Sequence, residues 1–216
     1  MLKHRTILFA AVLIFATSIY GPRLLAAAVE LNRALMEASA TRDPERIRKL
    51  LADGADPNFE DASGVTPLIN AAARGNNRSI RLLLDAGARI DEDGDNGCSA
   101  LTWAARNGWD KTTEILLDRG ATIDHRDKGE LTPLMRAAWN GQRNVVELLL
   151  RRGADVSARD RFGNTALAFA FAGRNKIIQG LVRAADRGAS QVDALRASTR
   201  IAEQPFVSCV ELAATR

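Results

Sequence analysis

The chain has 216 residues, of which 46% are hydrophobic and 26% are charged, with a net charge of +4. This composition is typical of a folded protein and excludes an intrinsically disordered chain. The excess charge has a local source: residues 1–28 hold three cations and no acid, and the remainder carries 27 basic against 26 acidic residues. A nearly neutral body argues against nucleic-acid binding, which needs a strongly basic face.

The first residues have the pattern of an export signal. A basic start at residues 3–5 precedes an apolar run over residues 6–20, and residues 26–28 offer a small-residue cleavage site. The run is shorter than the about 20 residues that a membrane span needs. We therefore expect a cleaved signal peptide at residues 1–28, with an uncleaved N-terminal membrane anchor as the alternative. In both cases the positive-inside rule places the rest of the chain in a bacterial periplasm, either free or held at the inner membrane.

A short motif recurs along the chain at a constant spacing, with copies that begin at positions 66, 99, 132 and 165. Periods between about 20 and 50 residues indicate a stacked array in which each unit packs against its neighbours. Such arrays usually bind partners and seldom catalyse reactions. Two markers keep the period: Thr66-Pro67-Leu68 recurs as Ser99-Ala100-Leu101, Thr132-Pro133-Leu134 and Thr165-Ala166-Leu167, and Gly54-Ala55 recurs as Gly87-Ala88, Gly120-Ala121 and Gly153-Ala154.

One copy of the motif predicts the local structure of a unit. Ser99 is expected to cap a helix that begins at Ala100, where two sister units have proline, a residue favoured in the first helical turn. Gly108 is expected to end this helix, and a second helix then runs to Gly120. An extended stretch follows, and residues 125–130 form a polar turn that projects away from the helices.

This pattern resembles the ankyrin repeat, whose first helix begins with a Thr-Pro-Leu-His-x-Ala motif and whose period is likewise about 33 residues. The resemblance implies an all-α repeat solenoid of ankyrin-type helix–turn–helix units joined by β-hairpin-like loops. It implies an ankyrin repeat domain at residues 29–190, followed by a short helix and a loose tail at 191–216. Five units are expected in the domain: a cap at 31–63, full units at 64–96, 97–129 and 130–162, and a second cap at 163–190.

The sequence departs from the ankyrin pattern at three places. The motif histidine is replaced in every unit, so we expect apolar packing to join neighbouring helices in its place. Glu130 stands where other units have a turn glycine, and we expect Gly129 to supply the turn with a one-residue shift. Gly173 stands one position earlier than the period from Gly141 requires, which predicts that one residue is missing between the helices of the last unit. The residues at the histidine position are Ile69, Thr102, Met135 and Ala168.

Residues for catalysis are scarce. An enzyme needs a convergent set of nucleophile, base and oxyanion donors, or of metal ligands. The chain has two histidines, of which His4 lies in the export segment and His125 is expected to be solvated on a loop tip. The acidic run at residues 91–96 lacks the pattern of a calcium loop. We therefore predict a protein that is not an enzyme and that holds no cofactor or metal.

Two cysteines, Cys98 and Cys209, lie far apart in the sequence and have no zinc-ligand spacing. Outside the cytoplasm a disulfide between them is chemically permitted and would tie the tail across the array. Two unpaired cysteines are the alternative.

Positions that vary between units are the candidates for partner contact. The ankyrin resemblance implies docking on the hairpin tips and on the concave face of the first helices. Aromatic and arginine side chains there would dominate the binding energy, unless they fill gaps between units. The tips also change from acidic at 60–61 and 91–95 to mixed or basic at 125–128 and 159–161, which could orient a charged partner or be a solvated edge. The candidate partner-binding residues are Asn70, Trp103, Trp109, Arg136, Trp139 and Phe169.

The sequence thus predicts a non-enzymatic protein–protein interaction module, exported to the periplasm as a monomer. It would present a concave ankyrin surface to an unidentified protein partner, with no nucleic acid and no membrane contact except through an uncleaved N-terminal segment. The alternative is an envelope-anchored ankyrin scaffold held by that segment.

Overall fold

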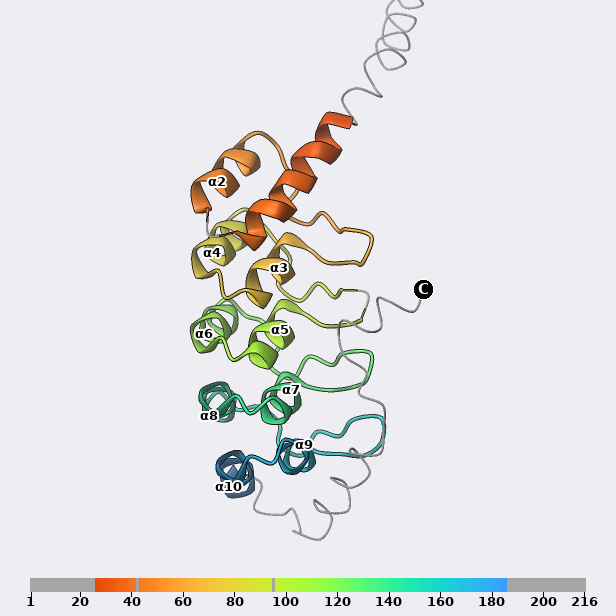
Figure 1. Ribbon diagram of the computed structural model, residues 1–216, viewed down its shortest axis with the longest axis vertical. Helices are drawn as coiled ribbons and strands as arrows, with labels where there is room; N and C mark the ends of the chain where they lie inside the picture. Colours follow the sequence, from red (N-terminus) through yellow and green to blue (C-terminus); the bar gives the residue numbers. More distant parts are fainter. Residues whose placement is uncertain (1–25, 42, 95, 186–216) are drawn as a thin grey trace, which may run out of the picture.

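The computed structural model describes residues 26–41, 43–94 and 96–185 (Figure 1). Within these ranges the chain forms ten helices and no strand. The first helix covers residues 26–40. The others are α2 (Pro44–Ala52), α3 (Pro67–Ala73), α4 (Asn77–Asp85), α5 (Ala100–Asn107), α6 (Asp110–Asp118), α7 (Pro133–Trp139), α8 (Arg143–Arg151), α9 (Ala166–Ala172) and α10 (Lys176–Ala185).

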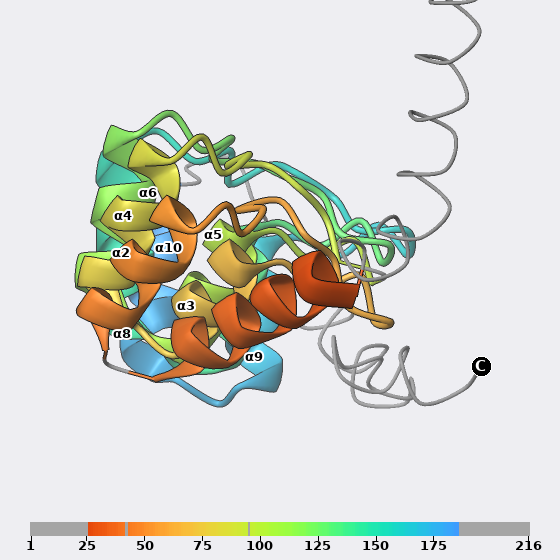
Figure 2. The same cartoon turned by 90° about the horizontal axis from the view of Figure 1, so that it is seen from above.

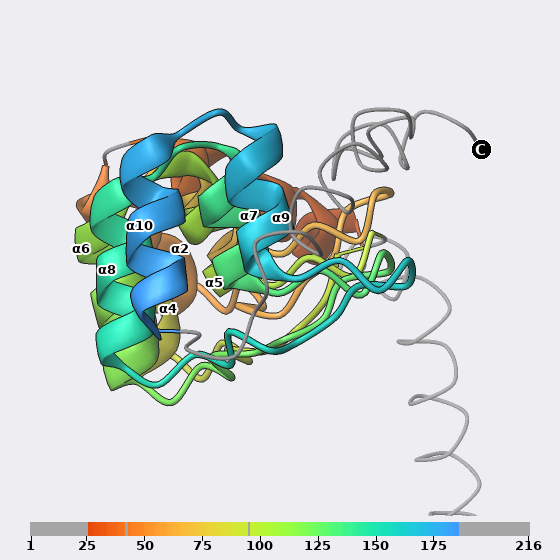
Figure 3. The same ribbon diagram turned by 90° about the horizontal axis from the view of Figure 1, so that it is seen from below.

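The helices stack in two rows along one long axis (Figure 1). The first helices α3, α5, α7 and α9 form one row, and the second helices α2, α4, α6, α8 and α10 form the other. Long loops project sideways from the row of first helices (Figure 2), and α9 and α10 close the far end of both rows (Figure 3). This arrangement confirms the predicted all-α repeat solenoid.

The first helices begin at hydroxyl caps, as the sequence predicts. The side-chain oxygens of Thr66, Ser99 and Thr132 each accept the N–H three residues later, at 3.2 to 3.3 Å. Proline follows the two threonines and has no N–H to leave unpaired at the first helical position. Thr165, at the same place in the last unit, makes no such bond.

The core is built from small and branched side chains that recur at equivalent positions of successive units. Paired alanines on three first helices, such as Ala104 and Ala105, are fully buried, and small side chains let neighbouring helices approach closely. Because each unit repeats the same buried positions, the core is continuous along the stack. The buried branched residues, none more than 1% exposed, are Leu68, Leu101, Leu134 and Leu167 on the first helices and Leu83, Leu116, Leu149 and Val182 on the second.

The last unit keeps the period of the earlier ones, so the predicted loss of one residue is wrong. Arg174 has a left-handed backbone with φ 53°, in the position that Gly108 and Gly141 occupy in earlier units. Gly173 is required for a different reason, because a Cβ there would lie 2.5 Å from the carbonyl oxygen of Trp139. The glycine that appeared displaced in the sequence therefore marks a close helix–helix approach.

The turn at Glu130 also keeps its register, and the predicted shift to Gly129 is wrong. Glu130 itself is left-handed with φ 61°, close to the 79° of Gly163 in the next unit. Its N–H donates to the carbonyl of Asp127 at 2.7 Å. The carboxylate of Asp127 also accepts the N–H groups of Gly129 and Leu131 at 2.8 and 3.0 Å, which fixes the turn.

Several predictions concern residues outside the described ranges. The apolar run before residue 26, the tail at 191–216 and Cys209 all belong to this group. Residues 26–28, the predicted cleavage site, form the start of the first helix and are exposed. Among the helices that the structure describes, none is both long and apolar enough to cross a membrane.

Candidate partner-binding face

The first helices present one side to the second helices and the opposite side outward. On α5, Leu101, Ala104 and Ala105 are buried toward the core. Trp103 and Arg106 lie on the opposite side of this helix and are half-buried. We call the side of the first helices that is turned away from the second helices the inner face. The hairpin loops project beside it (Figure 2).

Three large side chains lie on the inner face of the two central first helices, α5 and α7. The Arg106 guanidinium lies over the ring of Trp103, 5.1 Å from its centroid. Trp139 occupies on α7 the position that Arg106 has on α5, and its ring lies 5.2 Å from the Phe169 ring at 39°. Cations within about 6 Å of an aromatic ring are attracted to its face. Trp103 and Arg106 on α5 and Trp139 on α7 are thus half-buried residues on the same side of two neighbouring first helices, and we call these three residues the inner-face cluster.

Burial, and then the nearby positive charge of Arg136, lower the pKa of the Arg106 guanidinium. An arginine side chain starts from a pKa so high that it stays protonated in proteins. The inner-face cluster therefore carries a permanent positive charge.

Arg136 does not fit the predicted docking role. Its side chain is 5% exposed and forms an ion pair with the fully buried carboxylate of Asp127, with 2.8 Å between Nε and Oδ2. Paired charges of this kind are costly to separate inside a protein. Arg136 ties α7 to its own hairpin loop and offers a partner almost no surface.

Phe169 and Asn70 also have structural contacts. Phe169 is 2% exposed and belongs to the core between α7 and α9, so the prediction that it contacts a partner is corrected. Asn70 is half-buried, and its amide donates to the carbonyl of Met36 at 3.0 Å. This bond joins α3 to the N-terminal helix at residues 26–40. Of the predicted set, Trp103 on α5 and Trp139 on α7 are half-buried on the inner face.

Trp109 links two units. Its indole N–H donates to the carbonyl of Ala73 at 3.0 Å, and a Cβ at Gly75 would lie 2.7 Å from its ring. The side chain is 38% exposed. It lies in the turn between α5 and α6, outside the inner-face cluster.

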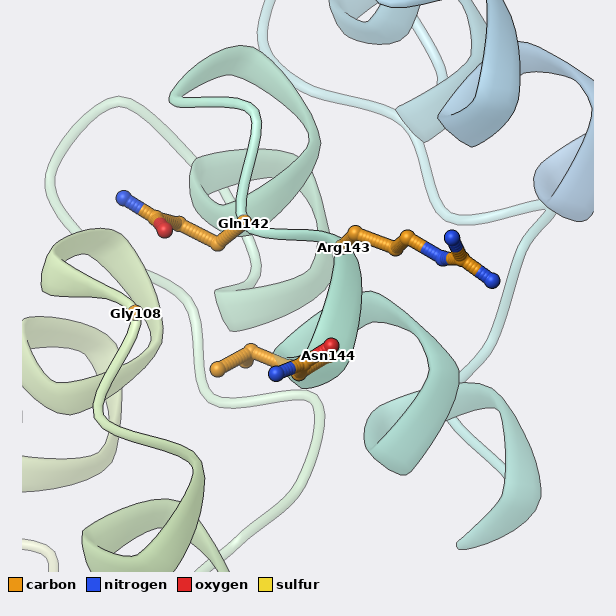
Figure 4. Close-up of a pocket in the computed structure, with 5 residues that line it drawn as sticks. Gly108, Gln142, Arg143 and Asn144 are labelled. Atoms are coloured by element: carbon orange, nitrogen blue, oxygen red, sulfur yellow. The ribbon is translucent and has the colours of Figure 1, made fainter.

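The same turn position carries a linking side chain in two other units. Asn76 donates to the carbonyls of Ser39 and Thr41 at 2.9 and 3.0 Å. Gln142 donates to the carbonyl of Arg106 at 3.2 Å, and Figure 4 shows it reaching across Gly108 while Arg143 points the other way. These amides add polar links between units to the apolar packing expected at the histidine position, where Ile69, Met135 and Ala168 are buried in the core.

Figure 4 also shows the groove that Gln142 borders. Its volume is about 200 Å³, and it is lined by Gly108, Arg143, Asn144 and Val145 as well. The lining brings together no nucleophile with a base and no carboxylate pair. The residues that line this groove therefore do not supply the nucleophile and base of a catalytic site.

A second set of polar contacts joins neighbouring hairpin loops. Asn58, Asp91 and Asp124 occupy the same position in successive units. Each accepts a backbone N–H from the following unit, at 2.7 to 3.0 Å. The acidic residue at 91, expected to be solvated, is thus part of the scaffold. The donors are the N–H groups of Arg89, Thr122 and Asp155.

His125 is also less exposed than the sequence suggests. Its side chain is 15% exposed, and its Nε2 lies 2.6 Å from Asp93 Oδ1. Burial raises the pKa of Asp93, although the nearby His125 opposes this shift. The pair connects two neighbouring hairpins.

Comparison with known families decides the identity of the fold. Three copies of the model for ankyrin repeats match residues 35–127, 94–160 and 125–193. The chain belongs to the ankyrin repeat family. Ankyrin repeats are protein–protein interaction modules and are generally non-enzymatic. No curated protein matches the sequence.

Possible ligand sites in this ankyrin protein are few. Within the described ranges, no group of three or more His, Cys, Asp or Glu side chains is arranged to hold a metal ion. Cys98 is fully buried, with its sulfur 3.8 Å from Asp127 Oδ2. Since Cys209 lies outside the described residues, the disulfide between the two cysteines stays a prediction.

The ankyrin units contain one signal that comparison of their sequences could have revealed. Asp61, Asp127 and Asp160 occupy the same position of the hairpin turn. In each case the carboxylate accepts the N–H groups two and four residues later. In the remaining unit this position is Gly94, and Asn96 bonds to the N–H of Cys98 instead. The recurrence of this aspartate identifies it as a turn residue.

Proposed function

We propose that this ankyrin protein is exported to the periplasm and captures one partner protein on its inner face, without catalysis. The observation that supports this most strongly is the inner-face cluster of Trp103, Arg106 and Trp139. Tryptophan and arginine are the residues that most often dominate interface energies. In the flanking units, the positions equivalent to Arg106 and Trp139 hold Ala73 and Ala172. The two large side chains therefore lie between two small ones along the stack.

The scaffold holds this surface in place before a partner arrives. Side chains at Asn76, Trp109 and Gln142 bond to carbonyls of the preceding unit, and Asn58, Asp91 and Asp124 bond to N–H groups of the following one. A preformed surface loses less conformational freedom on binding, which improves affinity. The protein would thus act as a rigid binding surface.

Crosslinking in intact cells tests the proposed docking surface. A photoreactive amino acid is placed at Trp103 on the inner face and, as the matched control, at the exposed Arg81 on α4. We expect discrete crosslinked proteins from position 103 and none of the same species from position 81. The same products from both positions, or products from position 81 alone, would contradict the proposal.

Export has its own test, because it rests on the sequence of residues 1–28. We expect the mature protein, isolated from the periplasm, to begin near Val29. A chain that keeps its first residues and fractionates with the inner membrane would replace this proposal with the anchored scaffold. A protein found in the cytoplasm would contradict both.

A further inference from the structure

A groove lies between the start of α2 and the start of α4, two neighbouring helices of the second row (Figure 1). Its volume is about 470 Å³. It is lined by Pro44 on α2 and by residues 75–79, which form the turn before α4 and the first turn of that helix. The groove lies outside the inner-face cluster, so a ligand bound in it is independent of the proposed docking surface.

The start of α4 offers two backbone N–H donors to this groove. Helices leave their first N–H groups without an intrahelical acceptor, and a side-chain cap usually accepts one of them. The N-cap residue Asn76 makes no such bond, because its amide is turned toward carbonyls of the preceding unit. Within the described ranges, the N–H groups of Arg78 and Ser79 therefore have no acceptor.

The Ser79 hydroxyl is a third donor, and it is almost fully enclosed. Ser79 is 1% exposed and lines the groove, yet its Oγ forms no hydrogen bond with any described residue. The equivalent residue of the next unit, Thr112, donates to Asn77 Oδ1 on α4 at 2.6 Å. One unit earlier, the position that corresponds to Asn77 is Pro44, which has no side-chain acceptor. Since buried polar groups are normally hydrogen-bonded, the Ser79 hydroxyl points to a ligand in the groove.

The charges around these donors favour an anion. Arg78 is exposed and forms no ion pair with the described residues. The first turn of α4 contains no acid. Asp43, which precedes Pro44, already accepts the N–H of Arg46 at 3.0 Å as the cap of α2. The N–H groups and the dipole of a helix N-terminus both stabilise a bound anion.

The corresponding starts of α6 and α8 lack this combination. On α6, Asp110 supplies a carboxylate of its own, which accepts the N–H of Lys111 at 2.7 Å. On α8, Val145 stands at the serine position and brings no hydroxyl, and Arg143 is already in an ion pair. Of these three described helices, α4 alone combines the backbone donors with a hydroxyl and an available arginine.

We infer that the start of α4 binds a phosphate group. Its oxygens accept hydrogen bonds from the N–H groups of Arg78 and Ser79 and from the Ser79 hydroxyl, and the Arg78 guanidinium pairs with its charge. A phosphate group offers three strong acceptor oxygens and a carboxylate offers two, so three converging donors favour the phosphate. The groove is larger than a phosphate ion and leaves room for an organic group attached to it.

Titrations of the full chain, followed by NMR of the backbone N–H groups, test this site. The probes are inorganic phosphate and glycerol phosphate, and the controls are chloride and acetate at matched ionic strength. We expect saturable shifts of the Arg78 and Ser79 N–H signals with at least one of the phosphates and not with the controls. If neither phosphate gives a saturable shift at millimolar concentration, or if acetate gives an equal one, the inference is overturned.

The two probes also distinguish the source of the phosphate. Tighter binding of glycerol phosphate supports a phosphate group carried on a larger molecule. Equal or tighter binding of inorganic phosphate supports the free ion.

Substitutions at matched positions then assign the binding to α4. We expect Arg78→Gln to weaken phosphate binding about tenfold and Ser79→Ala about fivefold, because each removes a donor, charged in the first case. Ser79→Thr keeps a hydroxyl, as Thr112 does in the next unit, and should bind as the wild type does. Lys111→Gln, at the position of α6 that corresponds to Arg78, should leave the affinity within about twofold.

Thermal midpoints show which variants are folded, and the exposed Arg78→Gln keeps the test decisive if the buried Ser79→Ala does not fold. Wild-type affinity in folded Arg78→Gln, or an equal loss in Lys111→Gln, would overturn the inference. Neither result bears on the crosslink from position 103, which tests the proposed function separately.

Discussion

At the scale of single residues, Arg136 shows how position in the fold decides the role of a side chain. It varies between units and lies on a first helix, as a partner-contact residue would, yet it is buried against Asp127. The carboxylate of Asp127 in turn holds the hairpin turn through two N–H groups. Removing one member of a buried ion pair leaves the other charge without compensation.

Arg136→Ala should therefore lower the free energy of unfolding by about 3–5 kcal/mol, measured by urea denaturation. The matched control is Arg143→Ala, which removes an exposed pair with Glu147 and should cost about 0–1 kcal/mol. If the two substitutions cost the same, the buried pair does not have the structural role described here.

The left-handed turn at Glu130 predicts a substitution that stabilises the protein, in contrast to Arg136→Ala. A side chain in this backbone region costs roughly 1–2 kcal/mol, because Cβ approaches the following carbonyl oxygen. Glu130→Gly should therefore raise the free energy of unfolding by about 1 kcal/mol, after the loss of its weak surface pair with Arg126. The control Gly163→Ala, at the same turn position, should lower it. A loss of stability in Glu130→Gly would show that the turn keeps another conformation in solution.

Two hairpin aspartates should respond to pH in opposite directions. Burial raises the pKa of Asp124, whereas hydrogen bonds from Ser157 lower the pKa of Asp155. The stability that Asp124 contributes is complete below its unfolded pKa and is lost as pH rises through the folded value. The contribution of Asp155 is complete above its unfolded pKa and is lost as pH falls through the folded value.

Asp124→Asn should therefore raise the thermal midpoint at pH 7, and the gain should vanish near about pH 3, where the carboxyl is protonated in both states. Asn58 already fills the equivalent position in an earlier unit and accepts the N–H of Arg89. Asp155→Asn is the matched control and should lower the midpoint at pH 7. Equal changes at both pH values would mean that ionisation does not cause the effect.

At the scale of helices and turns, the last unit offers a test of register. The structure places Arg174 at the left-handed position and Gly173 against the carbonyl of Trp139. Gly173→Ala should then cost about 1–3 kcal/mol through overpacking, and Arg174→Gly should add about 1 kcal/mol to the free energy of unfolding. Urea denaturation of both variants measures whether each substitution lowers or raises the free energy of unfolding. A shortened unit, with Gly173 in the left-handed turn, predicts no gain from Arg174→Gly.

The sequence was a sufficient guide to the helices because their signals are local. The cap at Ser99, the turn at Gly108 and the leucine at 116 each depend on neighbours within one unit. The links between units were not predictable in the same way. Whether Trp109 reaches the carbonyl of Ala73 depends on how two units stack, and no local pattern records that distance. The prediction of a missing residue at Gly173 failed for the same reason, because the contact that requires this glycine comes from α7.

The candidate site was predictable only in part. Aromatic and arginine side chains at varying positions pointed to the first helices, and Trp103 and Trp139 do lie on the inner face. Arg136 and Phe169 are not on the docking surface, because Arg136 is buried against Asp127 of the hairpin and Phe169 is buried against Trp139 of α7. Arg106 entered the site through its contact with the Trp103 ring, which depends on side-chain packing that the sequence pattern does not show.

At the scale of the whole molecule, the stack behaves as a row of similar units joined by nearest-neighbour contacts. The second helices face away from the hairpins and mix charges of both signs, whereas the first helices present an acid-free inner face with one aromatic cluster. Stability therefore depends on the links between units, and we propose that binding depends on the inner-face cluster. These two roles are separable by substitution.

The most direct test of binding at the inner face is the affinity of the crosslinked partner for purified variants of the full chain. For Trp103→Leu combined with Arg106→Gln, we expect affinity at least tenfold weaker than for the wild type. The thermal midpoint should remain within a few degrees, and Ile177→Ala on the exposed surface of α10 should change neither quantity. Wild-type affinity in the folded double variant would contradict the central claim that the inner face binds the partner.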